Sequence, residues 1–258
     1  MKINFFKYQG AGNDFVIIDN RSGNIRLTTA QVNFLCDRRF GIGADGLMLV
    51  AQAEGYDYRM VYFNADGHES TMCGNGGRCM AAFTYHAGLA GTEQFFTAVD
   101  GAHKANILSG DLVSLEMQDV THITIEEDAT ILNTGSPHFV QFVADVAAID
   151  VYKEGKAIRN RDQFQPKGIN VNFVMATPSG LKIRTYERGV EAETLACGTG
   201  VTAAAIASAA DKTGKLIIPV EAMGGMLEVS FEKKDAQQAT NIWLKGPAKM
   251  VFSGTIEI

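Results

Sequence analysis

Long hydrophobic runs and basic clusters are both missing from this sequence. No apolar run approaches the roughly 20 residues that a membrane-spanning helix needs. The N-terminal residues lack the apolar core and small-residue cleavage site of a signal peptide. The net charge is −6 and the lysines and arginines are dispersed, which argues against a nucleic-acid footprint. We therefore expect a cytoplasmic protein that binds neither nucleic acid nor membrane.

Cysteine and proline are also scarce, with four and five residues respectively. The four cysteines are Cys36, Cys73, Cys79 and Cys197. In a cytoplasmic chain they are more typical of thiols than of a disulfide scaffold. They are too few and too scattered for a metal knuckle, so the sequence predicts no metal site.

A glycine-rich stretch at residues 41–46, "GIGADG", matches the dinucleotide-binding pattern G-x-G-x-x-G. That fingerprint requires a helix to follow, because the helix N-terminus holds the pyrophosphate. Here the strand-like run "LMLV" follows instead, and no Walker-type phosphate loop occurs. The sequence therefore does not favour nucleotide binding.

The local pattern predicts many short strands and three helices. The strands are rich in β-branched or aromatic residues and are bounded by turn formers; they cover residues 15–19, 46–50, 58–63, 112–117, 138–143, 171–176, 181–186 and 226–232. The helices are expected at 29–37, about 74–87 and about 198–210, the first capped by Thr28 or Thr29. The third helix, "GTGVTAAAIASAA", has almost no polar face and should be buried all round. A curved sheet or barrel wrapped around it is the simplest container.

A repeat with an offset of 124 residues runs through the chain. Without a gap, "YFNADGHESTMCGNG" (62–76) falls on "YERGVEAETLACGTG" (186–200). The match pairs Tyr62 with Tyr186, Glu69 with Glu193, and Cys73 with Cys197. Both segments carry C-G-x-G and lead into a helix-like stretch, and the same offset places Phe-Val at 15–16 on Phe-Val at 139–140. We interpret this as two halves of similar build.

The two repeated cysteines each stand just before a helix, where unpaired N–H groups and the helix dipole favour a thiolate and can hold a carboxylate. Two such thiols acting on one ligand suit the inversion of a stereocentre next to a carboxylate. Cys73 or Cys197 would remove the α-proton, and the other would return a proton to the opposite face. The converging N–H groups would stabilise the charge that develops on the carboxylate.

Other roles are open to the cysteines as well. Cys36 and Cys79 are expected to be core residues, because free cysteine packs as a small hydrophobe. For Cys73 and Cys197 the alternatives are packing or a redox pair, whose disulfide would inactivate the enzyme.

Several motifs together closely resemble the diaminopimelate epimerase family. They are "GAGNDFVIID", "FNADG…MCGNGGRC", "GSPHFV", "YERG" and "ACGTG", and the resemblance runs from Tyr8 to the final "GTIEI". It implies a cofactor-independent isomerase of lysine and peptidoglycan-precursor biosynthesis that acts on diaminopimelate, commonly as a homodimer.

The implied fold is of the α/β class, α+β type, with two pseudo-twofold-related domains. Each domain is a β-barrel-like mixed sheet around a central helix. The last strand would return to the first domain. The expected domains are therefore residues 1–117 with 248–258, carrying Cys73, and residues 118–247, carrying Cys197.

The resemblance also implies roles for individual residues. Cys73 and Cys197 are the base and the acid, and they exchange roles with the direction of reaction. His138 and Glu187 help to deprotonate them. The reacting carboxylate lies against Gly74, Asn75, Gly198 and Thr199. The distal amino-acid end is read by Asn64, Asn170, Glu187 and Arg188, with Asn13 nearby; the adjacent anion and cation of Glu187-Arg188 suit a distal zwitterion.

The chain departs from the family at three places near the distal substrate end. Ser136 stands where the family often has asparagine, Gly46 stands where some members have a substrate-contacting glutamine, and the loop 188–197 looks one residue longer. The first alternative is a proline or hydroxyproline racemase of the same fold, although those enzymes typically carry Asp before a Ser-Pro-Cys run, where this chain has "ETLAC". The phenazine-biosynthesis type lacks the cysteine pair. The alternative from another class is a non-catalytic amino-acid-binding or thiol-redox protein.

Overall fold

The computed structural model describes residues 1–210 and 212–258, which form two compact units. One unit comprises Met1–Leu115 and Gly246–Ile258, and the other comprises Glu116–Lys245. These boundaries lie two residues before those expected for the domains. The chain is an α+β protein dominated by strands, as expected.

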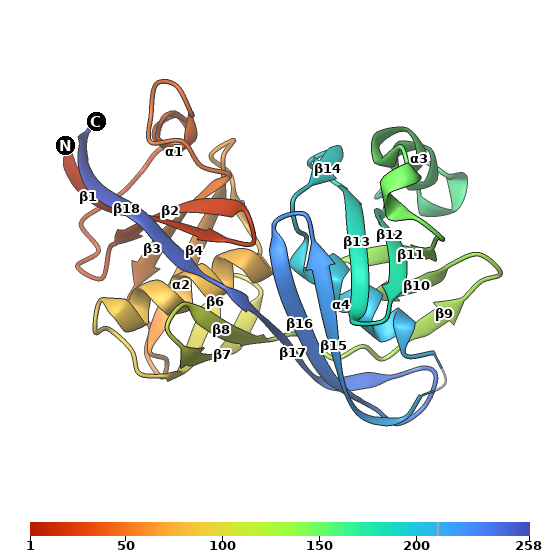
Figure 1. Ribbon diagram of the computed structural model, residues 1–258. Coiled ribbons are helices and arrows are strands. Elements are labelled where there is room, and N and C mark those ends of the chain that lie inside the picture. The colour runs from red at the N-terminus through yellow and green to blue at the C-terminus, as the bar shows by residue number, and fades with distance from the viewer. Residues whose placement is uncertain (211) are drawn as a thin grey trace. The chain divides into compact units, whose positions relative to one another are not determined.

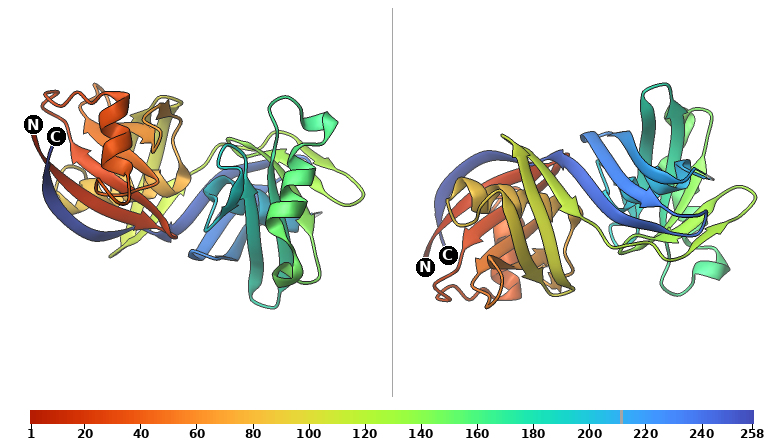
Figure 2. Two further views of the ribbon diagram at one scale, coloured as in Figure 1. Left: turned by 90° about the horizontal axis from the view of Figure 1, so that it is seen from above. Right: turned by 90° about the horizontal axis from the view of Figure 1, so that it is seen from below.

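The first unit is a curved mixed sheet with two helices. Its strands are β1 (Lys2–Gly10), β2 (Asn13–Asp19), β3 (Gly46–Ala51), β4 (Tyr58–Asn64), β5 (Glu69–Ser70), β6 (Glu93–Ala98), β7 (Gly101–Ser109), β8 (Leu112–Glu116) and β18 (Lys249–Glu257). Neighbours run in the order β18-β1-β2-β3-β4-β6-β7-β8, and the pairs β2–β3 and β4–β6 are parallel. The last strand lies beside the first (Figure 2), and the N–H of Ile258 donates to the carbonyl of Met1 (2.9 Å).

Helix α2 (Gly74–His86) lies against the sheet of the first unit, in contact with β1, β2, β3, β7 and β18 (Figure 1). Its residues 74–84 are all buried. The other helix, α1 (Thr29–Cys36), is short and is capped by Thr28 with Gln31 in a reciprocal capping box.

The second unit repeats this plan. Its strands are β9 (Ile123–Ile125), β10 (Thr130–Asn133), β11 (Pro137–Phe142), β12 (Asn170–Thr177), β13 (Gly180–Glu187), β14 (Ala192–Thr194), β15 (Gly214–Ala222), β16 (Gly225–Lys233) and β17 (Ala239–Pro247). The order is β9-β10-β11-β12-β13-β15-β16-β17, with β11–β12 and β13–β15 parallel. Helix α4 (Gly198–Ser208) contacts β10 to β13, β15 and β16, and it is buried on nearly every residue. Helix α3 (Val151–Arg159) and the 3₁₀ turns η1 (Val146–Ala148) and η2 (Asp162–Phe164) complete the unit.

The repeat found in the sequence is confirmed by the strand pairing. The offset of 124 carries β7 onto β16, and it carries the pair Glu93–Asn106 onto the observed pair Ile217–Ser230. Several other pairings are shifted by one residue: Phe15 pairs with Gly46 in the first unit whereas Phe139 pairs with Val171 in the second, and the β3–β4 and β4–β6 pairings differ in the same way from β12–β13 and β13–β15. The two halves therefore share their topology, but several strand pairs of the second unit are shifted by one residue relative to the 124-residue offset.

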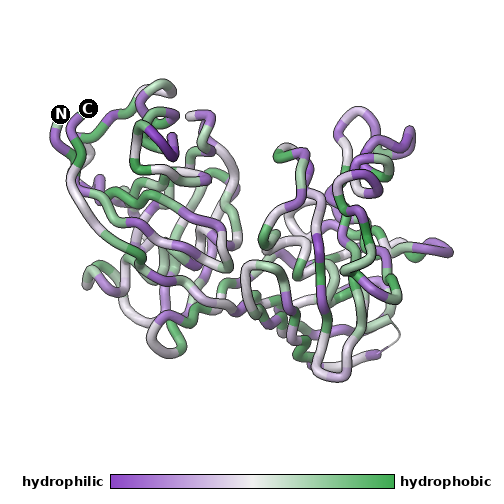
Figure 3. Tube along the Cα trace, turned by 45° about the horizontal axis from the view of Figure 1, so that its top comes forward, coloured by the Kyte–Doolittle hydropathy of each residue, from purple (hydrophilic) through white to green (hydrophobic). Residues whose placement is uncertain are grey.

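The expected strands and helices are all present, with ends shifted by one or two residues. Helix α3 was not predicted, although the sequence contains a cap residue and a short apolar face that fit it. Asp150 caps it by accepting from the N–H of Lys153, and Val151, Gly155 and Ile158 form its buried face. Hydrophobic and hydrophilic stretches alternate along the trace (Figure 3). No helix within residues 1–210 or 212–258 is long and apolar enough to cross a membrane.

Candidate active site

The two repeated cysteines occupy equivalent places, each within its own unit. Cys73 is the N-cap of α2 and Cys197 is the N-cap of α4, and both have extended backbone angles. The carbonyl of Cys73 accepts from Gly77 N–H (2.7 Å), and that of Cys197 accepts from Val201 N–H (2.9 Å). Neither thiol caps its own helix. Each sulfur thus stands at a helix N-terminus, where the dipole favours negative charge.

The amide of Asn13 lies between Cys73 and a carboxylate. Its Oδ1 is 3.7 Å from Sγ of Cys73 and 3.4 Å from Nδ2 of Asn75. Its Nδ2 donates to the carboxylate of Asp45, which also accepts from Arg38. Asp45 therefore fixes the direction of the Asn13 amide and turns its oxygen toward Cys73.

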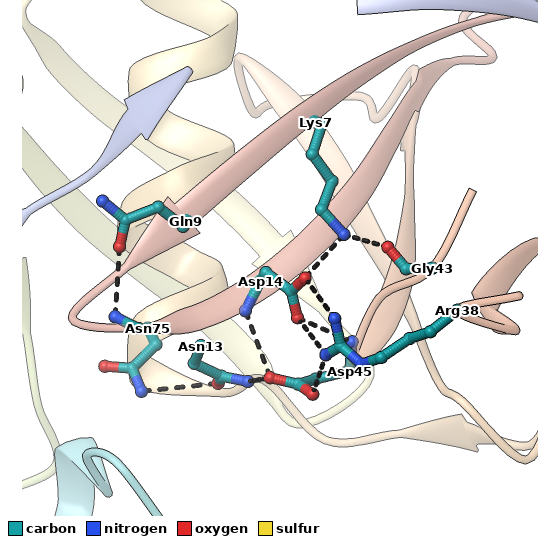
Figure 4. A network of polar contacts seen from close by, with 9 residues as sticks. Lys7, Gln9, Asn13, Asp14, Arg38, Gly43, Asp45 and Asn75 are labelled. Atoms are coloured by element: carbon teal, nitrogen blue, oxygen red, sulfur yellow. Dashed lines mark hydrogen bonds and ion pairs between the residues drawn. The ribbon is translucent and has the colours of Figure 1, made fainter. Parts of the chain in front are cut away.

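Asp45 belongs to an ionic network that lies beside Asn13 (Figure 4). Asp14 accepts from Lys7 at 2.7 Å and from both terminal nitrogens of Arg38 at 2.9 and 2.7 Å, and Arg38 also reaches Asp45 at 2.7 Å. Partial burial raises the pKa of Asp14, but the bonds from Arg38 and Lys7 outweigh it and hold that pKa well below the usual range. The network anchors the β2 end that carries Asn13.

Arg78 is a fully buried cation inside α2. Its guanidinium donates to Oδ1 of Asn75 (2.8 Å) and to the carbonyl of Gly74 (3.2 Å), while its Nε has no partner among the described residues. Burial lowers its pKa, and the neighbouring thiols of Cys79 and Cys73 oppose that shift. Arg78 thus places a positive charge behind the first turn of α2 and orients the Asn75 amide.

In the second unit Cys197 is 7% exposed, and its sulfur lies 3.4 Å from the hydroxyl of Thr199. That hydroxyl lies 2.9 Å from Nε2 of His138. His138 is fully buried, and burial, with a smaller effect of the Arg188 charge, lowers its pKa to about 3. The hydroxyl of Thr134 donates to the carbonyl of Thr199 (2.8 Å), which lies in the first turn of α4.

Two of the four residues expected at the distal substrate end meet on the second unit. Nδ2 of Asn170 donates to Oγ of Ser136 (2.8 Å), and a guanidinium nitrogen of Arg188 reaches the same hydroxyl (3.3 Å). Oδ1 of Asn170 accepts from the N–H of Arg188 (2.9 Å). Glu187 accepts from the hydroxyl of Thr194 (2.9 Å). Asn64 stands exposed at the end of β4 in the first unit.

Gly46 occupies a position with no room for a side chain. A Cβ there would lie 2.5 Å from Cε2 of Tyr62 and 2.7 Å from the Phe63 carbonyl. The backbone oxygen cannot move aside without disturbing the β3–β4 pairing. A glutamine at this position would therefore require a different local packing.

Cys36 and Cys79 are buried core residues, as expected. Burial raises the pKa of Cys36 to about 11, and it raises the pKa of Cys79 further. Their thiols are poor nucleophiles and poor proton acceptors near neutral pH. The described residues contain no group of three or more His, Cys, Asp or Glu placed to hold a metal ion.

The family comparison decides the assignment. The family model described as diaminopimelate epimerase matches residues 5–126 and 130–251. The chain belongs to the diaminopimelate epimerase family. The expected family and isomerase class are thereby confirmed, and the two matched segments correspond to the two halves of the repeat.

Relatives named diaminopimelate epimerase match over nearly their whole length. The protein of Flavobacterium psychrophilum is 50% identical over 254 residues, covering 97% of this chain and 99% of that protein. The protein of Chlorobaculum tepidum is 43% identical and covers 96% and 99%. The protein of Aquifex aeolicus is 38% identical and covers 98% and 97%.

Solved structures with low identity share the fold of this family member. A Bacillus anthracis phenazine biosynthesis protein of the PhzF family has a TM-score of 0.79 at 15% identity and covers 100% of both chains. A probable proline racemase from Agrobacterium radiobacter has a TM-score of 0.71 at 14% identity, covering 99% of this chain and 92% of its own. These likenesses confirm the expected two-domain epimerase-like fold.

Sequence reasoning missed residues whose side chains contact the named ones: Asp45, Arg78, Thr134 and Thr194. The sequence does mark Arg78 as unusual. It is a lone cation among small residues of the predicted helix, and the repeat aligns it with Thr202. The others depend on which side chains meet across strands, which spacing alone does not report.

Proposed function

We propose that this chain interconverts LL- and meso-diaminopimelate without a cofactor, in lysine and peptidoglycan-precursor biosynthesis. The observation that carries the proposal is the repeated cysteine at the N-terminus of a buried helix, in a chain of this family. The homologues' names supply the substrate, and the paired thiols supply a chemistry that fits it.

The proposed reaction moves one proton on and one proton off the same carbon. One thiolate, of Cys73 or Cys197, takes the α-proton and becomes a thiol, and the electron pair left behind is delocalised into the carboxylate. The other thiol then gives its proton to the opposite face and becomes a thiolate. Reversing the direction exchanges the two roles, so neither sulfur is permanently the base.

The α-carboxylate is proposed to bind at the first turns of α2 and α4, at Gly74, Asn75, Gly198 and Thr199. Backbone N–H groups at helix N-termini suit an anion whose charge grows during the reaction. Glycine next to each cysteine allows close backbone approach. Asn13 is oriented by Asp45 and completes the surroundings of Cys73.

The distal amino-acid end is proposed to be read by Asn64, Asn170, Glu187 and Arg188. The cluster of Asn170, Arg188 and Ser136 supports this role, since it joins a cation to amide and hydroxyl groups. The Glu187 carboxylate beside it would bind the distal ammonium group. A substrate with one amino-acid head would leave these groups unused, which favours diaminopimelate over proline. His138 and Glu187 are retained as groups that promote ionisation of the thiols.

The test is deuterium incorporation by the purified, reduced protein in D₂O. LL- and meso-diaminopimelate should acquire one deuterium at the inverted α-carbon, whereas L-proline and trans-4-hydroxy-L-proline should acquire none. Absence of α-deuterium in both diaminopimelate isomers would overturn the proposal. Uptake by proline or hydroxyproline alone would assign the racemase activity instead.

Three cysteine variants separate the two-base mechanism from other roles. Cys73→Ala and Cys197→Ala should each lower turnover about a hundred- to ten-thousandfold, because general acid–base groups typically contribute 10²–10⁴ each. Cys36→Ala is the matched control, since that thiol is buried in the core, and it should keep turnover. Substantial activity in either of the first two variants would contradict the mechanism.

We further propose a homodimer located in the cytoplasm, as the family resemblance implies. Sedimentation velocity across a hundredfold range of concentration measures the mass directly. A monomer mass throughout that range would contradict the dimer.

A further inference from the structure

Asn172 on β12 has an amide that is completely buried and bonded on both ends. Its Nδ2 donates to the carbonyl of Phe139 (3.1 Å), and its Oδ1 accepts from the hydroxyl of Thr185 (3.0 Å). The same Nδ2 lies 3.1 Å from Nδ1 of His138. These three contacts determine which way the amide points.

The direction of the amide determines where the His138 ring carries its proton. A backbone carbonyl has no hydrogen, so the atom facing Phe139 must be the amide nitrogen. That nitrogen is a donor only, so Nδ1 of His138 must accept from it. A neutral imidazole whose Nδ1 accepts carries its proton on Nε2.

The proton on Nε2 in turn orients the hydroxyl of Thr199. Nε2–H donates to Oγ1 of Thr199 across 2.9 Å, so the oxygen accepts there and its own hydrogen remains for Sγ of Cys197 at 3.4 Å. A donor aimed at sulfur stabilises the thiolate relative to the thiol. We infer that Asn172 is a positioning residue that locks the Nε2–H tautomer of His138 and, through Thr199, holds a hydroxyl donor on Cys197.

In this arrangement His138 neither gains nor loses a proton. The proton of Cys197 leaves to solvent or to substrate, and the imidazole remains a neutral donor. Full burial and the charge of Arg188 disfavour a second proton on the ring. His138 thus promotes ionisation of the thiol by hydrogen bonding, and the proton is not transferred to it.

The contacts that lead from Asn172 through His138 and Thr199 to Cys197, called the relay below, lie within the second unit. The glycine three residues after the repeated cysteine faces a different group in each unit. A Cβ on Gly200 would lie 2.4 Å from Oδ1 of Asn172, whereas a Cβ on Gly76 would lie 3.3 Å from Sδ of Met48. An apolar thioether therefore replaces the amide behind α2. Variants of the relay should change Cys197 and leave Cys73 unchanged.

The inference deepens the proposed function, on which its catalytic consequence rests, but its test needs no substrate. Failure of the relay and failure of the epimerase activity are therefore separately visible. The first measurement is the nitrogen NMR spectrum of protein labelled with ¹⁵N-histidine. At neutral pH the ring of His138 should show a protonated Nε2 and an unprotonated Nδ1; a protonated Nδ1 would overturn the inference.

The second measurement is the pH dependence of iodoacetamide alkylation, read at the Cys197 and Cys73 peptides of one sample by mass spectrometry. Thr199→Val removes the hydroxyl and should move the Cys197 midpoint upward by about one pH unit, the shift expected for loss of one hydrogen bond to a charged group. Thr199→Ser keeps the hydroxyl and should restore the original midpoint. The Cys73 midpoint should stay fixed in both variants.

Asn172 is tested with Asn172→Leu and the smaller, polar Asn172→Ser. Either variant should give a mixture of His138 tautomers and an upward shift of the Cys197 midpoint. An unchanged Cys73 midpoint shows that the fold survives. An unchanged Cys197 midpoint in a folded Asn172 variant, or in Thr199→Val, would overturn the relay.

Discussion

A Cβ on Gly200 would lie 2.4 Å from Oδ1 of Asn172, closer than folded proteins tolerate. The amide cannot retreat easily, because Phe139 and Thr185 hold its two ends. The second glycine of the C-G-x-G motif is thus required in this unit by the packing of α4 against β12.

Gly200→Ala should therefore destabilise the protein, and Gly76→Ala is its matched control at the equivalent helix position. Overpacking costs about 1–3 kcal/mol, and it exceeds the gain of up to about 1 kcal/mol for alanine over glycine in a helix. Gly76 faces the flexible side chain of Met48 at 3.3 Å, so Gly76→Ala should be neutral or stabilising. Urea unfolding measures both changes, and equal losses in the two variants would contradict this assignment.

Substitution of Arg78 should lower activity while changing the free energy of unfolding little. A buried charge can be replaced by a hydrophobic residue of similar size at little cost, because its desolvation penalty disappears as well. Arg78→Met should keep the free energy of unfolding within about 1 kcal/mol of the parent. It should also raise the alkylation midpoint of Cys73 and lower kcat, because the nearby cation and the bond to Asn75 are lost.

Arg78→Lys tests which of the two losses matters. Lysine keeps the charge but not the two-pronged contact with Asn75 and Gly74. The Cys73 midpoint should then stay near the parent value while kcat still falls. A Cys73 midpoint unchanged in Arg78→Met would contradict the electrostatic role of the arginine.

Asp14 should make stability depend on acid pH. Its pKa in the folded state is below the unfolded value, so its contribution is fully present above about pH 4 and is lost as pH falls toward the folded pKa. Asp14→Asn should cost about 2–3 kcal/mol at pH 7, between the values for exposed and buried pairs. The variant should also lose less stability than the parent between about pH 5 and pH 2.

Asp19→Asn is the control on the same strand. Asp19 pairs with Arg21 at 2.8 Å, but both side chains are more than a third exposed. Solvent screens such a pair, so its loss should cost less than about 1 kcal/mol. Urea titrations at several pH values compare the two variants, and similar losses would show that the Lys7–Asp14–Arg38 network contributes no more than a surface pair.

The sequence predicted the fold because its strongest signals are local or repeated. The alanine-rich stretch of α4 demands burial on every side, and the 124-residue offset carries the same plan into α2. Helix α3 was not predicted, because its apolar face is short and the residues around that face are mostly charged. The one-residue shifts between equivalent strand pairs, such as Phe15–Gly46 and Phe139–Val171, were not predicted, because the ungapped offset of 124 residues gives no sign of them.

The candidate site was predictable at its motifs but not behind them. Cys73 and Cys197 stand out because each precedes a glycine and a helix. Asn172 lies in a stretch, "VNFVMA", that indicates only a buried strand. Its role depends on three partners from other strands, and no local pattern reports that meeting.

The hydroxyl of Ser136 links the side chain of Asn170 to that of Arg188. The hydroxyl accepts from both side chains, so its removal frees Arg188 to take other rotamers without touching either thiol. Ser136→Ala should raise KM for diaminopimelate about tenfold, the effect of one hydrogen bond to a charged group, and change kcat by less than about twofold. A role in distal binding predicts this split, because uniform binding is lost while the chemistry is kept.

Ser136→Asn supplies the residue that the family often has at this position. Its amide also offers an acceptor to Arg188, so KM should return toward the parent value or fall below it. Steady-state kinetics in both directions of the reaction measure the two variants. A fall in kcat with KM unchanged in Ser136→Ala would instead place this hydroxyl near the reacting carbon and remove it from the distal end.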